Sequence, residues 1–293
     1  MRQQARLVDL TALGPLSYRD VWDLQHELHE RVRAGTVPQT WIAVEHEPVI
    51  TLGRNAKIGN LLLGREQLAA RGVDVVEIER GGDVTYHGPG QLVVYPIRKL
   101  ERFREVVPLV RSLEEAVIGA CARFGIEASR WSEHAGVWIG CNQICAIGLA
   151  VRQMTSFHGI AFNVSTELDY DRLINPCGLT DRGLTSLSRE AERDVTVEEA
   201  KAVLFAEFER VFDVQFIEAL PSTSVVAGAT PSLGMTDVGE ALGAAAVARG
   251  ACECAASQEG RSGAGASESS PGRDETSVPE SDCCRTSARA GSL

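Results

Sequence analysis

The sequence has few lysines and no long apolar run. Three of its 29 basic residues are lysines, namely Lys57, Lys99 and Lys201, and 40 acidic residues give a net charge of −11. Nucleic-acid phosphates favour a basic surface, so this charge argues against binding to nucleic acid. No stretch approaches the roughly 18 apolar residues of a membrane span, and no apolar segment follows the N-terminus as in a secretory signal. We therefore expect a cytoplasmic protein with neither a membrane nor a nucleic-acid partner.

Cysteine is also sparse, with eight residues in a chain of 293. In the C-terminal part, Cys252 and Cys254 lie two positions apart, and Cys283 and Cys284 are adjacent. These spacings match no standard zinc pattern, and adjacent cysteines are poor joint ligands. We expect free thiols in a reducing compartment, with no metal site and no cofactor.

Aromatic side chains are absent after residue 220. Gly, Ala, Ser, Thr and Pro dominate residues 221–293, so this stretch buries too little apolar surface to offset the entropy of ordering it. We therefore expect one folded domain over residues 1–220, followed by a low-complexity flexible tail over residues 221–293.

Helical and strand patterns alternate through residues 1–220. A helix capped by Ser17 is expected over residues 17–35, and a second over residues 108–125. A third begins at a capping box formed by Thr196 and Glu199. Strands are expected over residues 41–52 with an interruption near Pro48, over 73–79 and 159–164, and in a hairpin of 137–139 with 144–149. This mixture indicates an α/β or α+β domain with a mixed or antiparallel sheet.

Four glycines gather in the segment Arg80-Gly-Gly-Asp-Val-Thr-Tyr-His87-Gly-Pro-Gly-Gln91, which we place as a loop between two strands. Glycine lets the backbone approach a ligand closely, and Arg80 and His87 add polar side chains. The segment lacks the lysine and the spacing of a nucleotide-binding loop. It is therefore either a ligand-binding loop or a long hairpin connection.

Two shorter segments carry reactive side chains. Cys177 lies between Pro176 and Gly178, on a tight connection from which a thiol can project into a cleft. Most single cysteines are instead small buried residues, so both readings stay open. His158 enters a strand, where a histidine is either a structural hydrogen-bonding group or a catalyst.

Together these segments resemble one family, the lipoyl(octanoyl) transferases. The motif that begins at Arg80 is followed in the same order by Gly136-Val-Trp, Ile144-Cys-Ala-Ile-Gly-Leu, Phe157-His-Gly-Ile-Ala-Phe-Asn-Val and Ile174-Asn-Pro-Cys-Gly. The resemblance implies the α/β catalytic fold that is shared with biotin and lipoate protein ligases, with a mixed or antiparallel sheet flanked by helices.

The resemblance also implies an acyl transfer in protein lipoylation. Enzymes of this family take an octanoyl group from octanoyl-acyl carrier protein onto a cysteine, here Cys177, and pass it to a lysine of a lipoyl domain. The implied acceptors are the lipoyl domains of 2-oxoacid dehydrogenase E2 subunits and the H protein of glycine cleavage. The acyl and carrier-arm site would be lined by Arg80, Gly81, Gly82, Asp83, Val84, Thr85, Tyr86, His87, Ala146, Ile147, Gly148, Gly159, Ile160 and Ala161.

One position departs from the family pattern. Family members carry a lysine where this chain has Gln143, and glutamine supplies neither a full charge nor a transferable proton. With a thiol pKa of about 8.5, roughly 3% of the cysteine is thiolate at pH 7, a loss of up to about 30-fold in nucleophile. We therefore expect a substitute, with His158 or His87 acting as the base.

Two alternatives remain at this point. An ATP-dependent lipoate or biotin ligase on the same fold would activate the acid as an adenylate, but it depends on a lysine at the reaction centre. A degenerate paralogue without activity is favoured by Gln143 and disfavoured by Cys177, which stands in an intact motif.

Overall fold

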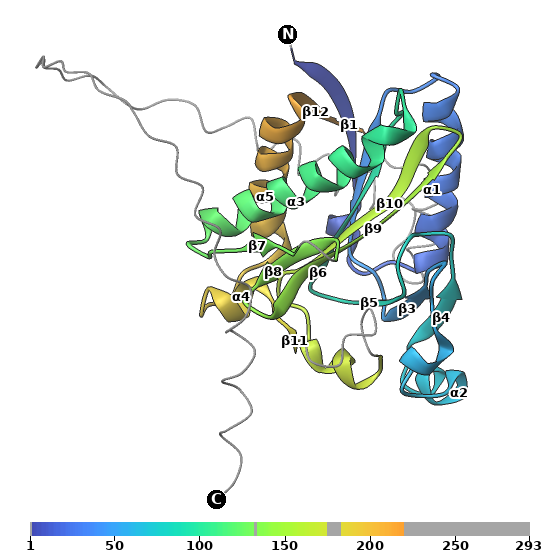
Figure 1. The fold of residues 1–293 in the computed structure, drawn as a ribbon, viewed down its shortest axis with the longest axis vertical. Helices are drawn as coiled ribbons and strands as arrows, with labels where there is room; N and C mark the ends of the chain where they lie inside the picture. Colours follow the sequence, from blue (N-terminus) through green and yellow to red (C-terminus); the bar gives the residue numbers. More distant parts are fainter. Residues whose placement is uncertain (1, 132–133, 175–182, 220–293) are drawn as a thin grey trace, which may run out of the picture. The chain divides into compact units, whose positions relative to one another are not determined.

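The structure, a computed structural model, describes residues 2–131, 134–174 and 183–219 (Figure 1). Cys177 and the whole stretch of residues 221–293 lie outside the described residues, so the expected tail is neither supported nor opposed. Within the described part, two β-sheets and the helices around them form the fold. No helix in that part is long and apolar enough to cross a membrane.

The larger sheet has nine strands within the described residues, in the order β12–β1–β2–β6–β10–β9–β8–β7, with β11 beside β9. Its strands are β1 (Gln3–Asp9), β2 (Thr40–Val44), β6 (Gln91–Ile97), β7 (Ser129–Arg130), β8 (Gly136–Ile139), β9 (Asn142–Arg152), β10 (Thr155–Asn163), β11 (Gly183–Leu184) and β12 (Val214–Glu218). Strands β12, β1 and β2 run parallel, and β2, β6, β10, β9, β8 and β7 pair antiparallel. The predicted mixed sheet and the predicted β8–β9 hairpin are therefore confirmed.

The central strands of this sheet are buried on both faces. In β2, Trp41 and Ala43 pack into one hydrophobic core, and Ile42 and Val44 pack into the other, because successive side chains of a strand point to opposite faces. Helices α3 (Val106–Arg123) and α5 (Val197–Phe212) cover the first face, and α1 (Tyr18–Arg33) covers the second (Figure 1). A strand covered twice has a nearly continuous apolar sequence, as β2 and β6 do.

The three long helices form where the apolar spacing predicts them, but two of their predicted caps differ in detail. Ser17 stands at the N-cap of α1, yet its side chain makes no capping hydrogen bond. Thr196 does cap α5, with its hydroxyl accepting from the backbone N–H of Glu199 at 3.1 Å. The Glu199 carboxylate pairs with Arg193 at 2.6 Å, so the second half of the capping box is missing.

A smaller sheet has the order β4–β3–β5, and within the described residues none of its strands pairs with a strand of the larger sheet. Its strands are β3 (Val49–Leu52), β4 (Asp74–Glu77) and β5 (Val84–His87), and α2 (Arg65–Ala69) packs on it. The prediction of one interrupted strand over residues 41–52 is therefore wrong, since β2 pairs with β6 and β3 pairs with β4 and β5. The chain leaves one sheet for the other just before Pro48, which has no N–H for a ladder.

The glycine-rich segment spans the return from the small sheet to the large one. It was expected to be a loop throughout, but residues 84–87 form β5, because Val, Thr and Tyr favour strands. The remaining short elements are η1 (Thr11–Leu13), η2 (Ile58–Asn60), η3 (Phe103–Glu105), η4 (Leu168–Arg172) and α4 (Leu187–Glu190). The N–H of Gly81 donates to the carbonyl of Leu149 at 3.0 Å, so the start of the segment lies against strand β9.

Candidate active site

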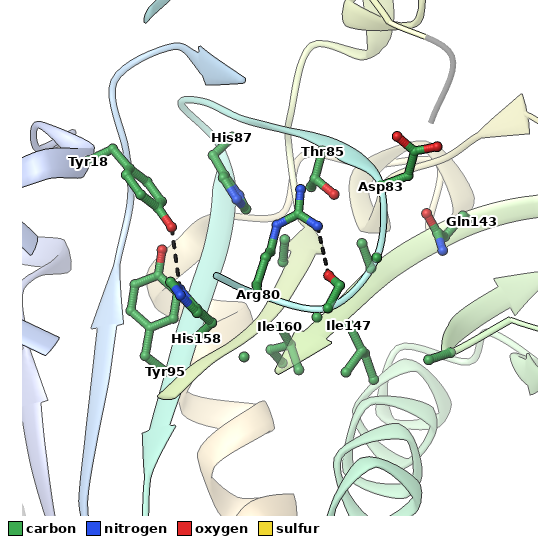
Figure 2. Close-up of a pocket in the computed structure, with 17 residues that line it drawn as sticks. Tyr18, Arg80, Asp83, Thr85, His87, Tyr95, Gln143, Ile147, His158 and Ile160 are labelled. Carbon is green, nitrogen blue, oxygen red and sulfur yellow. Dashed lines mark hydrogen bonds between the residues drawn. The ribbon is translucent and has the colours of Figure 1, made fainter. Parts of the chain in front are cut away.

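A cavity lies between the glycine-rich segment and strands β9 and β10 (Figure 2). It encloses about 500 Å³ of space, part of which is open to solvent. The residues on its wall that the sequence singled out are Arg80, Gly81, Gly82, Asp83, Thr85, His87, Gln143, Ala146, Ile147, Gly148, His158, Gly159, Ile160 and Ala161. We call it the first cavity.

Two residues predicted for the same wall, Val84 and Tyr86, line a second cavity instead. Strand alternation explains this, because β5 turns Thr85 and His87 toward the first cavity and its other two side chains the opposite way. Tyr86 stacks there on Tyr170, with ring centroids 4.3 Å apart. The second cavity encloses about 330 Å³ and shares Thr85 and Gln143 with the first. The predicted lining is therefore divided between two adjoining spaces.

The thiols that the structure describes differ from the expected nucleophile. Cys177 lies outside the described residues. Cys121 and Cys145 are buried in the core, where burial raises the pKa of Cys121 to about 12 and that of Cys145 well above its usual value. Both are therefore thiols at neutral pH and act as small apolar residues.

Gly159 allows the strands under the first cavity to come close together. A methyl group at this position would lie 2.0 Å from the carbonyl oxygen of Val94 on β6. In the β9–β10 ladder it pairs with Gly148, which also lies on the cavity wall. Two glycines opposite each other leave the middle of the floor without side chains, so a ligand can approach the backbone there.

Arg80 is buried and donates its hydrogen bonds mainly within the protein. Its Nε and Nη2 donate to the Thr51 hydroxyl at 3.1 and 2.9 Å, and Nη2 also donates to the Thr51 carbonyl at 2.7 Å. Nη1 donates to the carbonyl of Gly81 at 2.9 Å. These contacts fix the glycine-rich segment to β3. Arg80, which was predicted to offer a polar side chain to a ligand, is thus mainly a buried charge that holds the cavity wall in place.

Asp83 fixes the other side of the same segment. Its carboxylate accepts from the backbone N–H of Lys57 at 3.0 Å, from the backbone N–H of Val84 at 2.9 Å and from the amide of Asn60 at 2.5 Å. Because each oxygen is held by a donor from the surrounding loops, the rim of the cavity is fixed before any ligand arrives.

His158 is held on three sides. Its backbone adopts φ 54°, a left-handed conformation that is uncommon for residues other than glycine, and its N–H donates to Gln25 Oε1 at 2.9 Å. Nδ1 accepts from the Tyr18 hydroxyl at 3.4 Å, and Nε2 lies 3.6 Å from a carboxylate oxygen of Glu79. Burial lowers the pKa of His158, although Glu79 partly opposes this, so the imidazole is neutral at pH 7.

Glu79 itself stays ionised beside this imidazole. Burial alone would raise its pKa, but hydrogen bonds from His158 and its own backbone, together with the nearby histidines, lower the pKa to about 2. A carboxylate that orients an imidazole in this way also stabilises the imidazolium when a proton arrives.

His87 has one fixed tautomer. Asn163 donates to the carbonyl of Thr185 at 3.1 Å, so its Oδ1 accepts from Gln91 Nε2 at 3.0 Å. Gln91 Oε1 then faces His87 Nδ1 at 2.8 Å, which must carry the proton and donate. Nε2 of His87 therefore has a free lone pair. Burial and the neighbouring His46 and Arg80 hold the pKa of His87 well below its usual value.

Sequence reasoning missed Tyr18, Tyr95 and Ala135 on the cavity wall, and His46 behind it. His46 Nε2 accepts from the Tyr95 hydroxyl at 2.7 Å, and its Nδ1–H donates to the carbonyl of Leu16 at 3.2 Å. Burial lowers the pKa of His46 to about 4. No sequence pattern marks the two tyrosines as site residues, because Tyr18 lies at the start of a predicted helix and Tyr95 lies in an apolar stretch.

Comparison with known proteins identifies the family. Residues 17–209 match the lipoyl protein ligase A/B catalytic domain family. An octanoyltransferase of Nitratidesulfovibrio vulgaris is 44% identical over 207 residues, covering 70% of this chain and 94% of that protein. One of Koribacter versatilis is 40% identical over 217 residues, covering 72% of this chain and 86% of that protein. The chain belongs to this family, among its octanoyltransferases. The resemblance seen in the sequence motifs is confirmed.

Solved structures support the fold of this octanoyltransferase-family chain. A lipoate-protein ligase A bound with ATP superimposes with a TM-score of 0.65 at 16% identity, covering 78% of this chain and 93% of the other. A bipartite lipoate protein ligase from Thermoplasma acidophilum gives a TM-score of 0.64, covering 78% and 91%. At this identity the likeness concerns the fold alone, and it confirms the predicted ligase-like α/β catalytic domain.

Proposed function

We propose that this chain transfers an octanoyl group from octanoyl-acyl carrier protein to a lysine of a lipoyl domain through an acyl thioester on Cys177. Membership among the octanoyltransferases carries the proposal. The first cavity supports it, because apolar side chains such as those of Ile147 and Ile160 line the same space as the polar groups of His87 and His158. The activity is assigned to residues 1–220.

The chemistry needs two exchanges at one carbonyl carbon. The Cys177 sulfur attacks the octanoyl thioester, a new carbon–sulfur bond forms, and the carrier thiol leaves with the proton that Cys177 gave up. The lysine amine then attacks the enzyme thioester, an amide bond forms, and the Cys177 thiol is restored. The first exchange is nearly isoenergetic, and the enzyme thioester stays reactive toward an amine.

A proton must leave each attacking nucleophile, and two histidines of the first cavity are placed to receive it. His158 has the carboxylate of Glu79 beside it, which supports an imidazolium. His87 has a free Nε2 lone pair but no carboxylate partner, and its pKa is held low. We therefore assign the base to His158, which takes up the proton at Nδ1 through the Tyr18 hydroxyl that this nitrogen faces, and hydrogen-bond acceptance from the nucleophile to His87.

The partners follow from the reaction. The donor is octanoyl-acyl carrier protein, and we propose as acceptors the lipoyl domains of 2-oxoacid dehydrogenase E2 subunits and the H protein of glycine cleavage. A cytoplasmic location stays a prediction, as does independence from ATP and from any metal or cofactor.

Intact-mass spectrometry after mixing the full chain with octanoyl-acyl carrier protein tests the proposal. We expect one octanoyl adduct, labile to hydroxylamine, that disappears in Cys177→Ala. Cys141→Ala is the matched control, because Cys141 is a half-buried thiol on the β8–β9 turn, and it should keep the adduct. An adduct that survives Cys177→Ala, or no adduct on the native chain, contradicts the proposal.

A further inference from the structure

The side chain of Gln143 is buried at the junction of the two cavities. It lies on β9, it lines both cavities, and the residue is only 5% exposed. Its backbone is used by the sheet, since its carbonyl accepts from the N–H of Thr185 at 3.0 Å. Among the described residues, no hydrogen bond joins its terminal amide to another group.

The terminal amide atoms of Gln143 stay accessible to the cavities, so a ligand that enters can replace water as their hydrogen-bond partner. Gln91 shows the alternative in the same fold. Its amide accepts from His87 and donates to Asn163 and to the carbonyl of Tyr86, so both ends are satisfied. The amide of Gln143, by contrast, faces the space where a ligand enters (Figure 2).

The neighbouring strand is shaped around this amide. Gly136 has φ 142°, and a methyl group on it would lie 2.8 Å from Nε2 of Gln143 and 2.7 Å from the carbonyl oxygen of Cys145. The N–H of Gly136 donates to the buried carboxylate of Glu114 at 3.2 Å. Arg111 and Arg130 pair with that carboxylate at 2.8 and 3.2 Å, so the strand start beside the amide is fixed.

We propose that the Gln143 amide N–H donates a hydrogen bond to the thioester carbonyl oxygen, and that this hydrogen bond becomes stronger as the oxygen becomes an oxyanion. The inference rests on the proposed function and adds the group that stabilises the charge. When sulfur or amine attacks, the carbonyl π electrons move onto oxygen, and they return when the carbon–sulfur bond to the leaving thiol breaks. Gln143 gives up no proton in either exchange.

The side-chain type fits this role better than a proton relay. A neutral amide has two N–H donors and one acceptor oxygen but no group that titrates near neutral pH. A donor that faces the reacting carbonyl acts on charge that develops in the transition state. The second cavity gives the acyl group or its carrier arm space on the far side of the same amide.

Single-turnover acylation of the full chain by octanoyl-acyl carrier protein, followed by rapid quench and intact mass, tests the inference. Gln143→Met has nearly the same length and no donor, and it should slow acylation about 10²-fold. The ionised carboxylate of Gln143→Glu accepts hydrogen bonds but donates none, so this variant should slow acylation by as much. The dissociation constant for an unreactive amide-linked octanoyl carrier should rise by much less than the rate falls, because most of the hydrogen bond's strength appears only as charge develops on the oxygen. Native rates in Gln143→Met or in Gln143→Glu overturn the inference.

Gln39→Met is the matched control. The Nε2 of Gln39 is also buried without a partner, but the residue lies outside both cavities, so its replacement should leave acylation unchanged. The native chain decides between the two proposals. No Cys177-dependent adduct contradicts the proposed function, whereas an adduct that forms equally fast in Gln143→Met contradicts only the role of Gln143.

A substrate-side measurement does not depend on how the variants fold. A carrier loaded with dithio-octanoate presents a thiocarbonyl sulfur, which accepts hydrogen bonds poorly. On the native chain the rate ratio of thioester to dithioester should exceed the ratio for a small thiol in the same buffer. Equal ratios show that no donor acts on the carbonyl oxygen and overturn the inference.

Discussion

Tyr18, Tyr95 and His158 lie together at one end of the first cavity, and Gln143 lies at the other end (Figure 2). Hydrogen bonds join Tyr18 to His158 and Tyr95 to His46, whereas the Gln143 amide has no hydrogen-bond partner among the described residues. The first end carries hydrogen bonds between its own side chains, and a carboxylate lies beside His158 Nε2. The second end carries an amide that lines both cavities and has no hydrogen-bond partner among the described residues. The comparison suggests a division of labour, in which one end handles protons and the other handles the carbonyl oxygen.

Arg80 lies between the two ends and belongs to neither. Its bonds to Thr51 and Gly81 hold the segment that forms the roof. A fixed cation there also disfavours imidazolium at His87 and His158, because like charges repel. Glu79 offsets this effect at His158, which is why the two histidines are unequal.

The largest expected effect comes from removing both histidines. Together, His87→Ala and His158→Ala should slow single-turnover acylation of Cys177 by about 10²–10⁴-fold, the usual range for lost general acid–base help. His158→Ala should account for most of this loss, because only His158 has a carboxylate partner. His134→Ala, a half-buried histidine that stacks on Trp131, is the control and should have no effect. An unchanged rate in the double variant would show that the histidine end does no proton transfer.

The histidine end should also make folding stability depend on pH. Burial lowers the pKa of His46 to about 4, and it lowers those of His87 and His158 too, so the unfolded chain binds protons that the folded chain does not. This contribution to stability is therefore full above about pH 6.5 and is lost as the pH falls, and for His46 the loss is about 1.4 kcal/mol per pH unit down to about pH 4. His46 alone corresponds to about 3 kcal/mol over that interval.

Urea unfolding between pH 7.5 and pH 5 measures this slope. His46→Gln should reduce this slope by up to one proton. A stability that stays level or rises as the pH falls contradicts the neutral histidine cluster.

The sequence predicted the parts of this site that depend on local pattern. Glycines and polar residues at 80–87 indicated a ligand-binding loop, the family resemblance implied that 146–148 and 159–161 line the same site, and the structure brings most of these residues to one wall. Helices such as α1 followed from apolar spacing because each has one buried face. These are properties that a few neighbouring residues carry.

The site residues and strand pairings that the sequence did not predict depend on contacts between distant segments. Tyr18 meets His158 across 140 positions, and His46 meets Tyr95 across 49, so no local window contains either pair. The separation of β2 and β3 into different sheets likewise depends on pairing with β5 and β6. The sequence also does not show that the Gln143 amide lacks a hydrogen-bond partner among the described residues, because this depends on how distant segments pack around it.

The smallest expected effect concerns the only lysine near the Gln143 end within the described residues. The backbone of Lys57 is tied to Asp83 on the cavity rim, but its side chain is exposed, so solvent screens its charge. Lys57→Met should therefore leave both the acylation rate and its pH profile unchanged, and Lys99→Met, on an exposed residue outside the cavity, is the control. A drop of about 30-fold confined to Lys57→Met, the size expected for lost thiolate, would mean that a lysine still supplies the charge here. Gln143 would then act beside a cation rather than in place of one.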